Sequence, residues 1–274
     1  MIIIKYLIIL HSIINQLLYI LKLKKRLSKF LFLDSPINLN ENLTVLLGYG
    51  GNSVVFSNEA DNKVLIVDTK MWGGAKQLKA YVESLGENKE IVIVNTHPHP
   101  DHVGGNTRFP GATIITGETD HAIPNKSAEI IFLKQGEEYR IVIGPDTAFV
   151  RNIGRAHTSN DVVVYIPEHQ LLATGDIVFH HMHPALFKRE GSNVASWINT
   201  LTTLEEWDIK TVVPGHGKMT DKRAILEAKE YFVSIRDALD APETLEKLKQ
   251  RYADYDEVPL STSFDNTVKF MREE

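Results

Sequence analysis

The sequence predicts a layered α/β sandwich, and three observations favour it. From about residue 40 onward, short runs of strand type alternate with amphipathic helical segments. A unit of strand, helix and strand occurs twice, and His and Asp residues follow the ends of its strands. The chain has 274 residues, of which 43% are hydrophobic and 24% charged, so it can bury a full core. We expect one large domain over residues 39–274, preceded by a distinct segment at 1–38.

Residues 1–38 form an apolar and basic N-terminal extension. Residues 1–21 are far more apolar than the rest, and a basic cluster follows at 22–29. On a helix, the polar side chains between Lys5 and Lys22 would share one sector of about 140°. This pattern suits peripheral membrane contact through residues 1–30, and it also suits an extension packed on the domain or a mis-called start. No small-residue cleavage site follows, so we expect a cytoplasmic protein, or one on the cytoplasmic face of a membrane, rather than an exported one.

The first half of the domain is expected to contain a hairpin or meander and then a strand–helix–strand unit. The hairpin is predicted where β-rich runs are separated by Gly, Asn and Asp. The unit begins with a buried-type strand that precedes Asp68, and its second strand continues into a dense polar cluster. The predicted strands are 43–47, 53–56, 63–67 and 90–94, with a helix at 75–85.

The second half repeats this organisation with little sequence similarity. After further strands, a strand leads into Gly175-Asp176, a helix follows, and a last strand ends in Pro214-Gly215-His216-Gly217. Each unit therefore places an Asp and a His after its two strands. The predicted strands are 112–115, 139–143, 147–152, 161–166, 170–174 and 211–213, with helices at 194–207, 221–238 and 242–252.

Composition excludes several classes of function. The formal net charge of -5 has the wrong sign for a protein whose main partner is nucleic acid. The chain has no cysteine, which removes thiolate catalysis and Cys-ligated zinc. A metal site in this chain must therefore use His and carboxylate ligands.

The run His97-Pro98-His99-Pro100-Asp101-His102 is the most informative part of the sequence. In extended chain, alternate residues face one side, so His97, His99 and Asp101 can converge while the prolines point away. Each proline also restricts the residue before it to extended conformations. His102 is expected to begin a turn or helix and to face a different point, which predicts two metal positions.

Three further residues complete a candidate ligand set. His157 lies in a polar turn before an apolar strand, Asp176 follows Gly175, and His216 lies between two glycines. Small neighbours allow a metal or substrate to approach the backbone closely. None of the three is diagnostic alone, and the case depends on the whole set.

With these residues in place, the chain resembles the metallo-β-lactamase superfamily over about residues 40–220. The resemblance implies a four-layer αββα sandwich and a metal-dependent hydrolase. It implies that His97, His99 and His157 hold one metal, that Asp101, His102 and His216 hold the other, and that Asp176 bridges them. Asp176 differs from the Cys of the family's true β-lactamases. Asp68 matches an Asp that closes an early strand, for which we expect a role in orienting the ligand loop.

The chemistry of the ligands agrees with that resemblance. His and carboxylate ligands suit zinc, and also iron or manganese, and we expect two Zn²⁺ per chain. A pair of zinc ions lowers the pKa of bound water to about 7 and can polarise a carbonyl or phosphoryl oxygen. The predicted nucleophile is a hydroxide that bridges the metals, with Asp101 orienting it and carrying a proton to the leaving group. His183, in the loop after Asp176, is the candidate to line the substrate pocket or donate a proton.

Several functions stay open at this point. The first is hydrolysis of a small ester, thioester, lactone or lactam. Alternatives are a mononuclear iron oxidoreductase similar to persulfide dioxygenases, and a phosphodiesterase or nuclease of the same fold, which the negative net charge disfavours. A glutathione thioesterase is disfavoured because only 58 residues follow His216. The segment 191–197 is expected to start a helix capped by Ser192 or Asn193.

Overall fold

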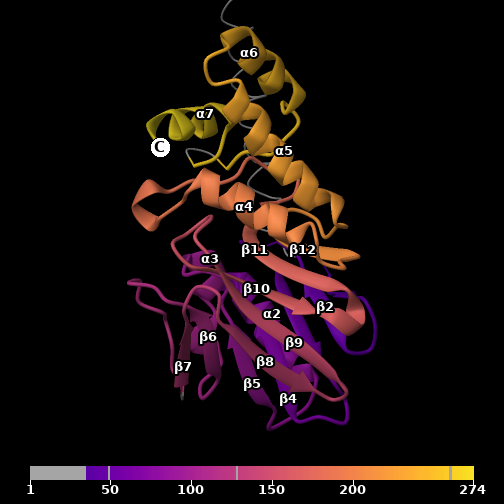
Figure 1. The fold of residues 1–274 in the computed structure, drawn as a ribbon. Helices are drawn as coiled ribbons and strands as arrows, with labels where there is room; N and C mark the ends of the chain where they lie inside the picture. The colour runs from indigo at the N-terminus through magenta and orange to yellow at the C-terminus, as the bar shows by residue number, and fades with distance from the viewer. Residues whose placement is uncertain (1–34, 49, 128, 259–260) are drawn as a thin grey trace, which may run out of the picture.

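The computed structural model describes residues 35–48, 50–127, 129–258 and 261–274. Within them, the strands form two sheets that lie face to face (Figure 1). The first sheet has the order β1-β2-β3-β4-β5-β6-β7. Its strands are β1 (Ile37–Asn38), β2 (Leu43–Leu46), β3 (Ser53–Ser57), β4 (Lys63–Val67), β5 (Glu90–Val94), β6 (Thr113–Gly117) and β7 (Glu129–Leu133).

The second sheet has the order β12-β11-β10-β9-β8. Its strands are β8 (Glu138–Ile143), β9 (Asp146–Gly154), β10 (Asp161–Ile166), β11 (Leu171–Phe179) and β12 (Thr211–His216). The helices are α2 (Trp72–Ser84), α3 (Pro100–Val103), α4 (Val194–Leu204), α5 (Arg223–Asp237), α6 (Pro242–Arg251) and α7 (Phe264–Glu273), with short 3₁₀ turns η1 (Asn106–Arg108), η2 (Pro167–His169) and η3 (Lys188–Glu190).

Three apolar clusters define the layers. The central one joins the inner faces of both sheets, for example Phe56 and Leu65 with Val150 and Val164. A second packs α2 on the outer face of the first sheet, and the third packs α4 and the C-terminal helices on the outer face of the second. Apolar faces that are buried on both sides of a sheet explain the continuous Val, Ile and Leu runs of these strands. The predicted αββα sandwich is confirmed.

The two strand–helix–strand units occur as predicted. In the first, β4 and β5 pair in parallel with α2 between them, and Val67 lies opposite Val94. In the second, β11 and β12 pair in parallel with α4 between them. Because a parallel pair brings both carboxyl ends to one edge, the polar residues after these strands meet at the same edge of the sandwich.

Some elements differ from the sequence prediction. β7, an edge strand that pairs only with β6, and α7 at the end of the chain were not predicted. β11 continues past Asp176 to Phe179, with shifts in its register against β12. Asn193, one of the two expected caps, accepts the backbone N–H of Ser196 at 2.8 Å and begins α4.

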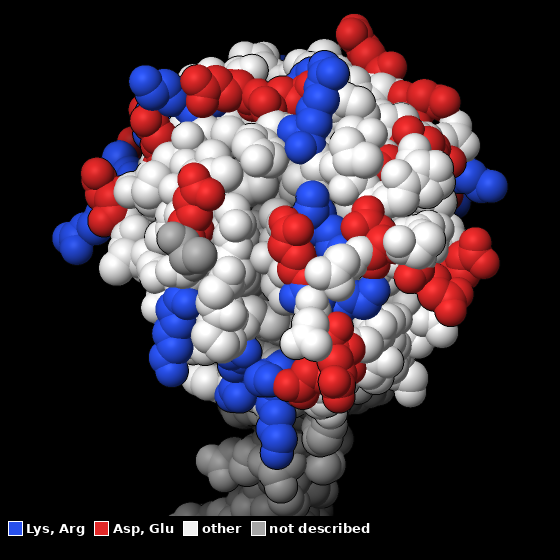
Figure 2. Space-filling model, turned by 90° about the horizontal axis from the view of Figure 1, so that it is seen from below, with Lys and Arg blue, Asp and Glu red and all other residues white. Residues whose placement is uncertain are grey.

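An N-terminal extension is expected at residues 1–38, and residues 1–34 of it lie outside the described residues. Its last residues already pair with the domain, because Ile37 lies opposite Val45. Over the described parts of the chain, none of the helices combines the length and apolarity needed to cross a bilayer. The face in Figure 2 carries Lys and Arg side chains interspersed with Asp and Glu.

Candidate metal centre

The candidate ligands come from loops and strand ends at one edge of the two sheets. The loop after β5 supplies His97 and His99, and α3 supplies Asp101 and His102. The other three, His157 between β9 and β10, Asp176 within β11 and His216 at the end of β12, come from the second sheet. The structure thus brings together all seven residues that the sequence singled out as ligands.

Four of these residues form a first group. One ligand atom from each of His97, His99, His157 and Asp176 lies within 4.8 Å of the others. His157 Nε2 is 3.0 Å from His99 Nδ1 and 3.3 Å from Asp176 Oδ2. His99 therefore directs its Nδ1 into the group, while its Nε2 contacts the carboxylate of Glu190.

Asp101, His102 and His216 form a second group, again within 4.8 Å. The Nε2 atoms of His102 and His216 face each other at 3.4 Å, and His216 Nε2 is 3.2 Å from Asp101 Oδ2. His99 ends the extended segment with φ -66° and ψ 145°, and α3 then turns the chain at Pro100. After this bend His102 belongs to the second group, although its ring lies 4.1 Å from that of His97, and its Nε2 faces Asp176 Oδ1.

Asp176 lies between the groups and faces both. Its Oδ2 is 3.7 Å from His97 Nε2 and belongs to the first group. Its Oδ1 is 3.2 Å from His102 Nε2 and 3.4 Å from His216 Nε2. A carboxylate with one oxygen toward each group can bridge two cations.

Hydrogen bonds behind the ligands fix the orientation of three imidazoles. His102 Nδ1 lies 2.7 Å from Asp68 Oδ2, and His157 Nδ1 lies 3.0 Å from the carbonyl oxygen of Ala185. His97 Nδ1 lies 3.0 Å from Thr96 Oγ1. When Nδ1 carries the proton in these contacts, Nε2 is left with a lone pair that faces the centre, which is the usual arrangement around a protein metal site.

Asp68 has the orienting role that the sequence predicted for it. It is 2% exposed, and its Oδ1 accepts the backbone N–H of Thr96 at 2.8 Å. Its Oδ2 accepts Thr96 Oγ1–H and faces His102, both at 2.7 Å. One buried carboxylate therefore positions the backbone, a hydroxyl and a ligand of the loop after β5.

Two glycines permit close packing at the centre, Gly175 of β11 against the loop after β5 and Gly215 of β12 against β11. Gly175 has φ +52°, and a Cβ there would lie 2.3 Å from Thr96 Oγ1. A Cβ on Gly215 would lie 2.0 Å from Asp176 Oδ1. A larger residue at either position would displace a group that the centre uses.

The electrostatics differ between the two groups. Burial lowers the pKa of His97 well below its ordinary value and that of His157 to about 3, so both imidazoles are neutral. Burial also disfavours charge on His102 and His216, but the nearby carboxylates of Asp176 and Asp101 outweigh it. They raise the pKa of His102 strongly and that of His216 to about 9. Positive charge is thus favoured where carboxylates converge, and a bound cation would replace these protons.

The residues fit a metal by an independent criterion. His97 Nε2 is buried and has no hydrogen-bond partner within the described parts of the chain, and the buried Asp176 Oδ1 faces the Nε2 atoms of His102 and His216. Buried polar atoms without partners are uncommon in folded proteins. A cation between the imidazoles and the carboxylate would satisfy both atoms, and the His and carboxylate donors suit zinc, iron or manganese.

A cavity of about 340 Å³ opens over the centre. Four candidate ligands are among the residues that line it: His99, Asp101, Asp176 and His216. The remaining described residues that line it are Met71, Pro100, Phe179, Met182, Ala185, Phe187, Glu190, Val258, Ser261 and Thr262. Its wall is mostly apolar, and its one charged residue outside the ligand set is Glu190.

His183, expected to line the pocket, is not among the residues that line this cavity. Its side chain is 3% exposed, with Nδ1 2.8 Å from Tyr231 Oη, and its ring packs against Tyr255 and Phe264. Met182 lines the cavity from that loop instead. The geometry gives His183 a packing role beneath the C-terminal helices.

Lys70 is a residue that sequence reasoning missed. Its side chain is fully buried, and Nζ donates to the carbonyl oxygens of Gly48 and Gly51, each at 2.7 Å. Gly51 packs so closely on His102 that a Cβ would lie 2.5 Å from the ring. Lys70 therefore helps to hold Gly51 against the ring of His102. A lysine three residues after a strand gives no local signal of this role.

Comparisons with known proteins agree with this geometry. The sequence model of the family described as "Metallo-beta-lactamase superfamily" matches residues 46–216. A metallo-beta-lactamase type 2 from Bacillus sp. (strain 170) is 28% identical over 216 residues, covering 70% of this chain and 79% of that protein. A hydroxyacylglutathione hydrolase from Methylococcus capsulatus is 35% identical over 109 residues, covering 38% of this chain and 40% of that protein.

Solved structures show the same fold. A metallo-beta-lactamase from Pontibacter korlensis superposes with a TM-score of 0.61 at 20% identity, covering 74% of this chain and 99% of that one. The DIM-1 metallo-beta-lactamase gives a TM-score of 0.59 at 22% identity, covering 73% and 97%.

Proposed function

The chain belongs to the metallo-β-lactamase superfamily, and on that premise we propose that it is a metal-dependent hydrolase of a small ester, thioester, lactone or lactam. The observation that supports this most is the position of Asp176, whose two oxygens face two groups of His and Asp residues. The relatives named as a β-lactamase and as a hydroxyacylglutathione hydrolase support hydrolysis of an acyl bond.

The proposed ligands follow the two groups. His97, His99 and His157 would hold one Zn²⁺, Asp101, His102 and His216 would hold the other, and Asp176 would bridge them. When bound, the two ions supply a nucleophile from water at neutral pH and polarise the oxygen of the scissile carbonyl.

Asp101 is the proposed proton carrier. It is half-buried, it lines the cavity, and its Oδ2 lies 3.2 Å from His216 Nε2. Without a metal, burial acts to raise the pKa of Asp101, but the charged His102 and His216 outweigh it and hold that pKa well below its ordinary value. A bound cation that replaced their protons would supply positive charge at the same place, so the carboxylate stays ionised at neutral pH. An ionised carboxylate that lines the cavity can accept the proton of the attacking water and return it to the leaving group.

The wall of the cavity favours an uncharged substrate. Among the described lining residues there is no Lys or Arg that could hold a substrate carboxylate, and Glu190 would repel one. Phe179, Phe187 and Met182 offer apolar surface for an acyl chain or ring. We therefore propose that neutral esters, thioesters and lactones are better substrates than lactams that carry a carboxylate.

The experiment is a hydrolysis panel with the zinc-loaded full chain. It pairs each neutral ester or lactone with an analogue that carries a carboxylate, and it includes the metal-stripped protein. We expect turnover only with metal, at a higher kcat/KM for the neutral member of each pair. Asp101→Asn should lower kcat by about 100-fold or more, whereas Asp61→Asn, far from the centre, should not. Absence of turnover across the panel with metal bound would contradict the proposal.

A further inference from the structure

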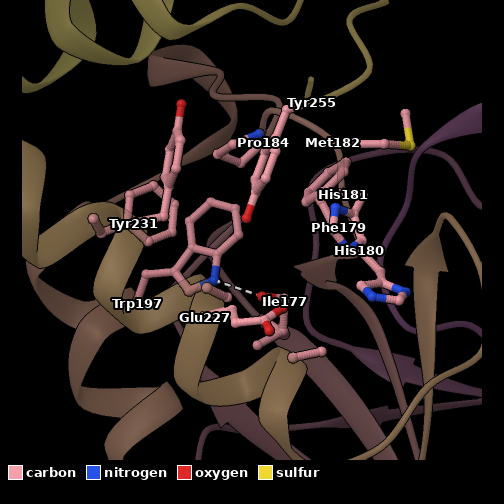
Figure 3. Close-up of a pocket in the computed structure, with 13 residues that line it drawn as sticks. Ile177, Phe179, His180, His181, Met182, Pro184, Trp197, Glu227, Tyr231 and Tyr255 are labelled. Atoms are coloured by element: carbon pink, nitrogen blue, oxygen red, sulfur yellow. Dashed lines mark hydrogen bonds between the residues drawn. The ribbon is translucent and has the colours of Figure 1, made fainter. Parts of the chain in front are cut away.

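Three metal-binding side chains lie together outside the centre described above. His180 and His181 follow β11, and Glu227 lies on α5. One ligand atom of each lies within 4.8 Å of the others. They line a second cavity, whose wall includes Trp197, Tyr231 and Tyr255 (Figure 3). None of the three is among the residues that line the cavity over the first centre.

The imidazole of His180 is held by a hydrogen bond to the backbone. Its Nδ1 lies 2.8 Å from the carbonyl oxygen of Lys218, an acceptor that requires the proton on Nδ1. The Nε2 atom of the neutral ring then keeps its lone pair. A backbone carbonyl bound to one ring nitrogen is the arrangement that commonly orients a histidine ligand for a metal.

The backbone holds the two adjacent imidazoles in place. Side chains of consecutive residues in extended chain point to opposite sides, but His181 has φ +55°, in the left-handed region that residues with a Cβ rarely adopt. The His180 N–H donates to the His216 carbonyl oxygen at 3.0 Å, and the His181 carbonyl oxygen accepts the Asp256 N–H at 2.9 Å. The left-handed conformation of His181 lies between these two hydrogen bonds. It allows the imidazole rings of His180 and His181 to face the same point.

Glu227 provides the acidic ligand from a different element. Its carboxylate is exposed on the first half of α5. Arg223, four residues earlier, is held by Asp221 through bonds of 2.7–3.1 Å, so that guanidinium already has a carboxylate partner. The Glu227 carboxylate can therefore turn toward the two imidazoles.

We propose that His180, His181 and Glu227 form a third metal site, for a divalent transition-metal ion of the zinc class. Two imidazoles and one carboxylate are a ligand set that zinc uses, with a fourth position open to water. Tetrahedral zinc at about 2.1 Å from its ligands needs donor atoms about 3.4 Å apart. Rotation of the exposed Glu227 and His181 side chains can bring the three donor atoms to that spacing.

A cation at this site would tie two parts of the fold together. His180 and His181 directly follow the carboxyl end of β11. Glu227 belongs to α5, a helix that packs on the second sheet. Binding to the folded chain alone raises its stability by mass action. The site would therefore stabilise the packing of α5 beside the catalytic edge, independently of whether the first centre turns over substrate.

The test compares zinc bound per chain in the wild type and in a His180→Ala/His181→Ala double variant. Both are stripped with chelator, dialysed against excess zinc and measured by elemental analysis. We expect the double variant to bind one zinc fewer per chain, and its melting temperature to rise less on addition of zinc. Glu227→Gln, a surface change on a helix that keeps both rings, should weaken binding of the same ion.

His121→Ala is the matched control, because His121 is an exposed histidine outside every candidate group. It should bind as much zinc as the wild type. Equal zinc content in the wild type and the double variant would overturn the proposal, and so would an equal loss of zinc in His121→Ala. Because the readout is the difference in metal count, it does not depend on hydrolase activity.

Discussion

Asp68→Asn removes one charge and one acceptor from a buried group without changing its shape. Asp68 accepts from the Thr96 backbone and hydroxyl and faces His102 Nδ1, at 2.7–2.8 Å. An amide has one acceptor oxygen, and its NH₂ group only donates. When the amide oxygen keeps the Thr96 N–H, the NH₂ group faces His102 Nδ1, which must then become an acceptor. The proton of His102 moves to Nε2, and the lone pair that faces Asp176 and His216 is lost.

The loss of this lone pair on His102 sets the size of the expected decrease in metal affinity. Changes to the groups behind a metal ligand typically cost 10- to 100-fold in affinity, or about 1.4–2.8 kcal/mol. We expect this loss for the ion held by Asp101, His102 and His216, measured by competition with a chromophoric chelator. Asp61→Asn is the matched control, because Asp61 also accepts backbone N–H groups but lies on the surface far from the centre. Wild-type affinity for both ions in Asp68→Asn would refute the reasoning.

Lys70 gives two further predictions. Lys70→Met leaves the buried carbonyl oxygen of Gly51 and the part-buried carbonyl oxygen of Gly48 without their donor. This should lower the free energy of unfolding by about 1–3 kcal/mol or more in urea titrations, and a loss below about 0.5 kcal/mol would contradict this. Burial lowers the pKa of Lys70 to about 7, so between about pH 7 and its ordinary value of 10.5 the folded chain binds fewer protons than the unfolded chain. The stability of the wild type relative to Lys70→Met should therefore rise across that window, and a fall would show that the sign is wrong.

The sequence predicted most of the strands because their signal is local. The runs that became β4, β5 and β10 are apolar and bounded by turn residues, and their bounds agree with the structure. β7 was missed because it is an edge strand that a short apolar run does not distinguish from a loop. α7 was missed because its packing depends on Tyr231 and Tyr252, which are distant in sequence and meet Phe264 only in the fold.

The candidate site likewise contains residues that could be predicted from the sequence and residues that could not. The ligand set could be predicted because His97, His99, Asp101 and His102 lie within one short motif, and parallel pairing sets where the remaining ligands meet. The positions of Lys70 and His183 could not. Each depends on long-range contacts: Lys70 on the carbonyl oxygens of Gly48 and Gly51, and His183 on Tyr231, 48 residues away in sequence. These contacts leave no periodic or spaced signal in the chain.

The zinc content of the His180→Ala/His181→Ala variant measures the two proposed metal positions around Asp176 alone, because the two substitutions remove the third proposed site from the count. The full chain is stripped, reloaded with zinc and measured by elemental analysis, with protein concentration determined independently. We expect two zinc ions per chain, and fewer when Asp176, the carboxylate that faces both groups, is changed to Ala. Little or no zinc in the double variant, or an unchanged count after Asp176→Ala, would contradict this expectation.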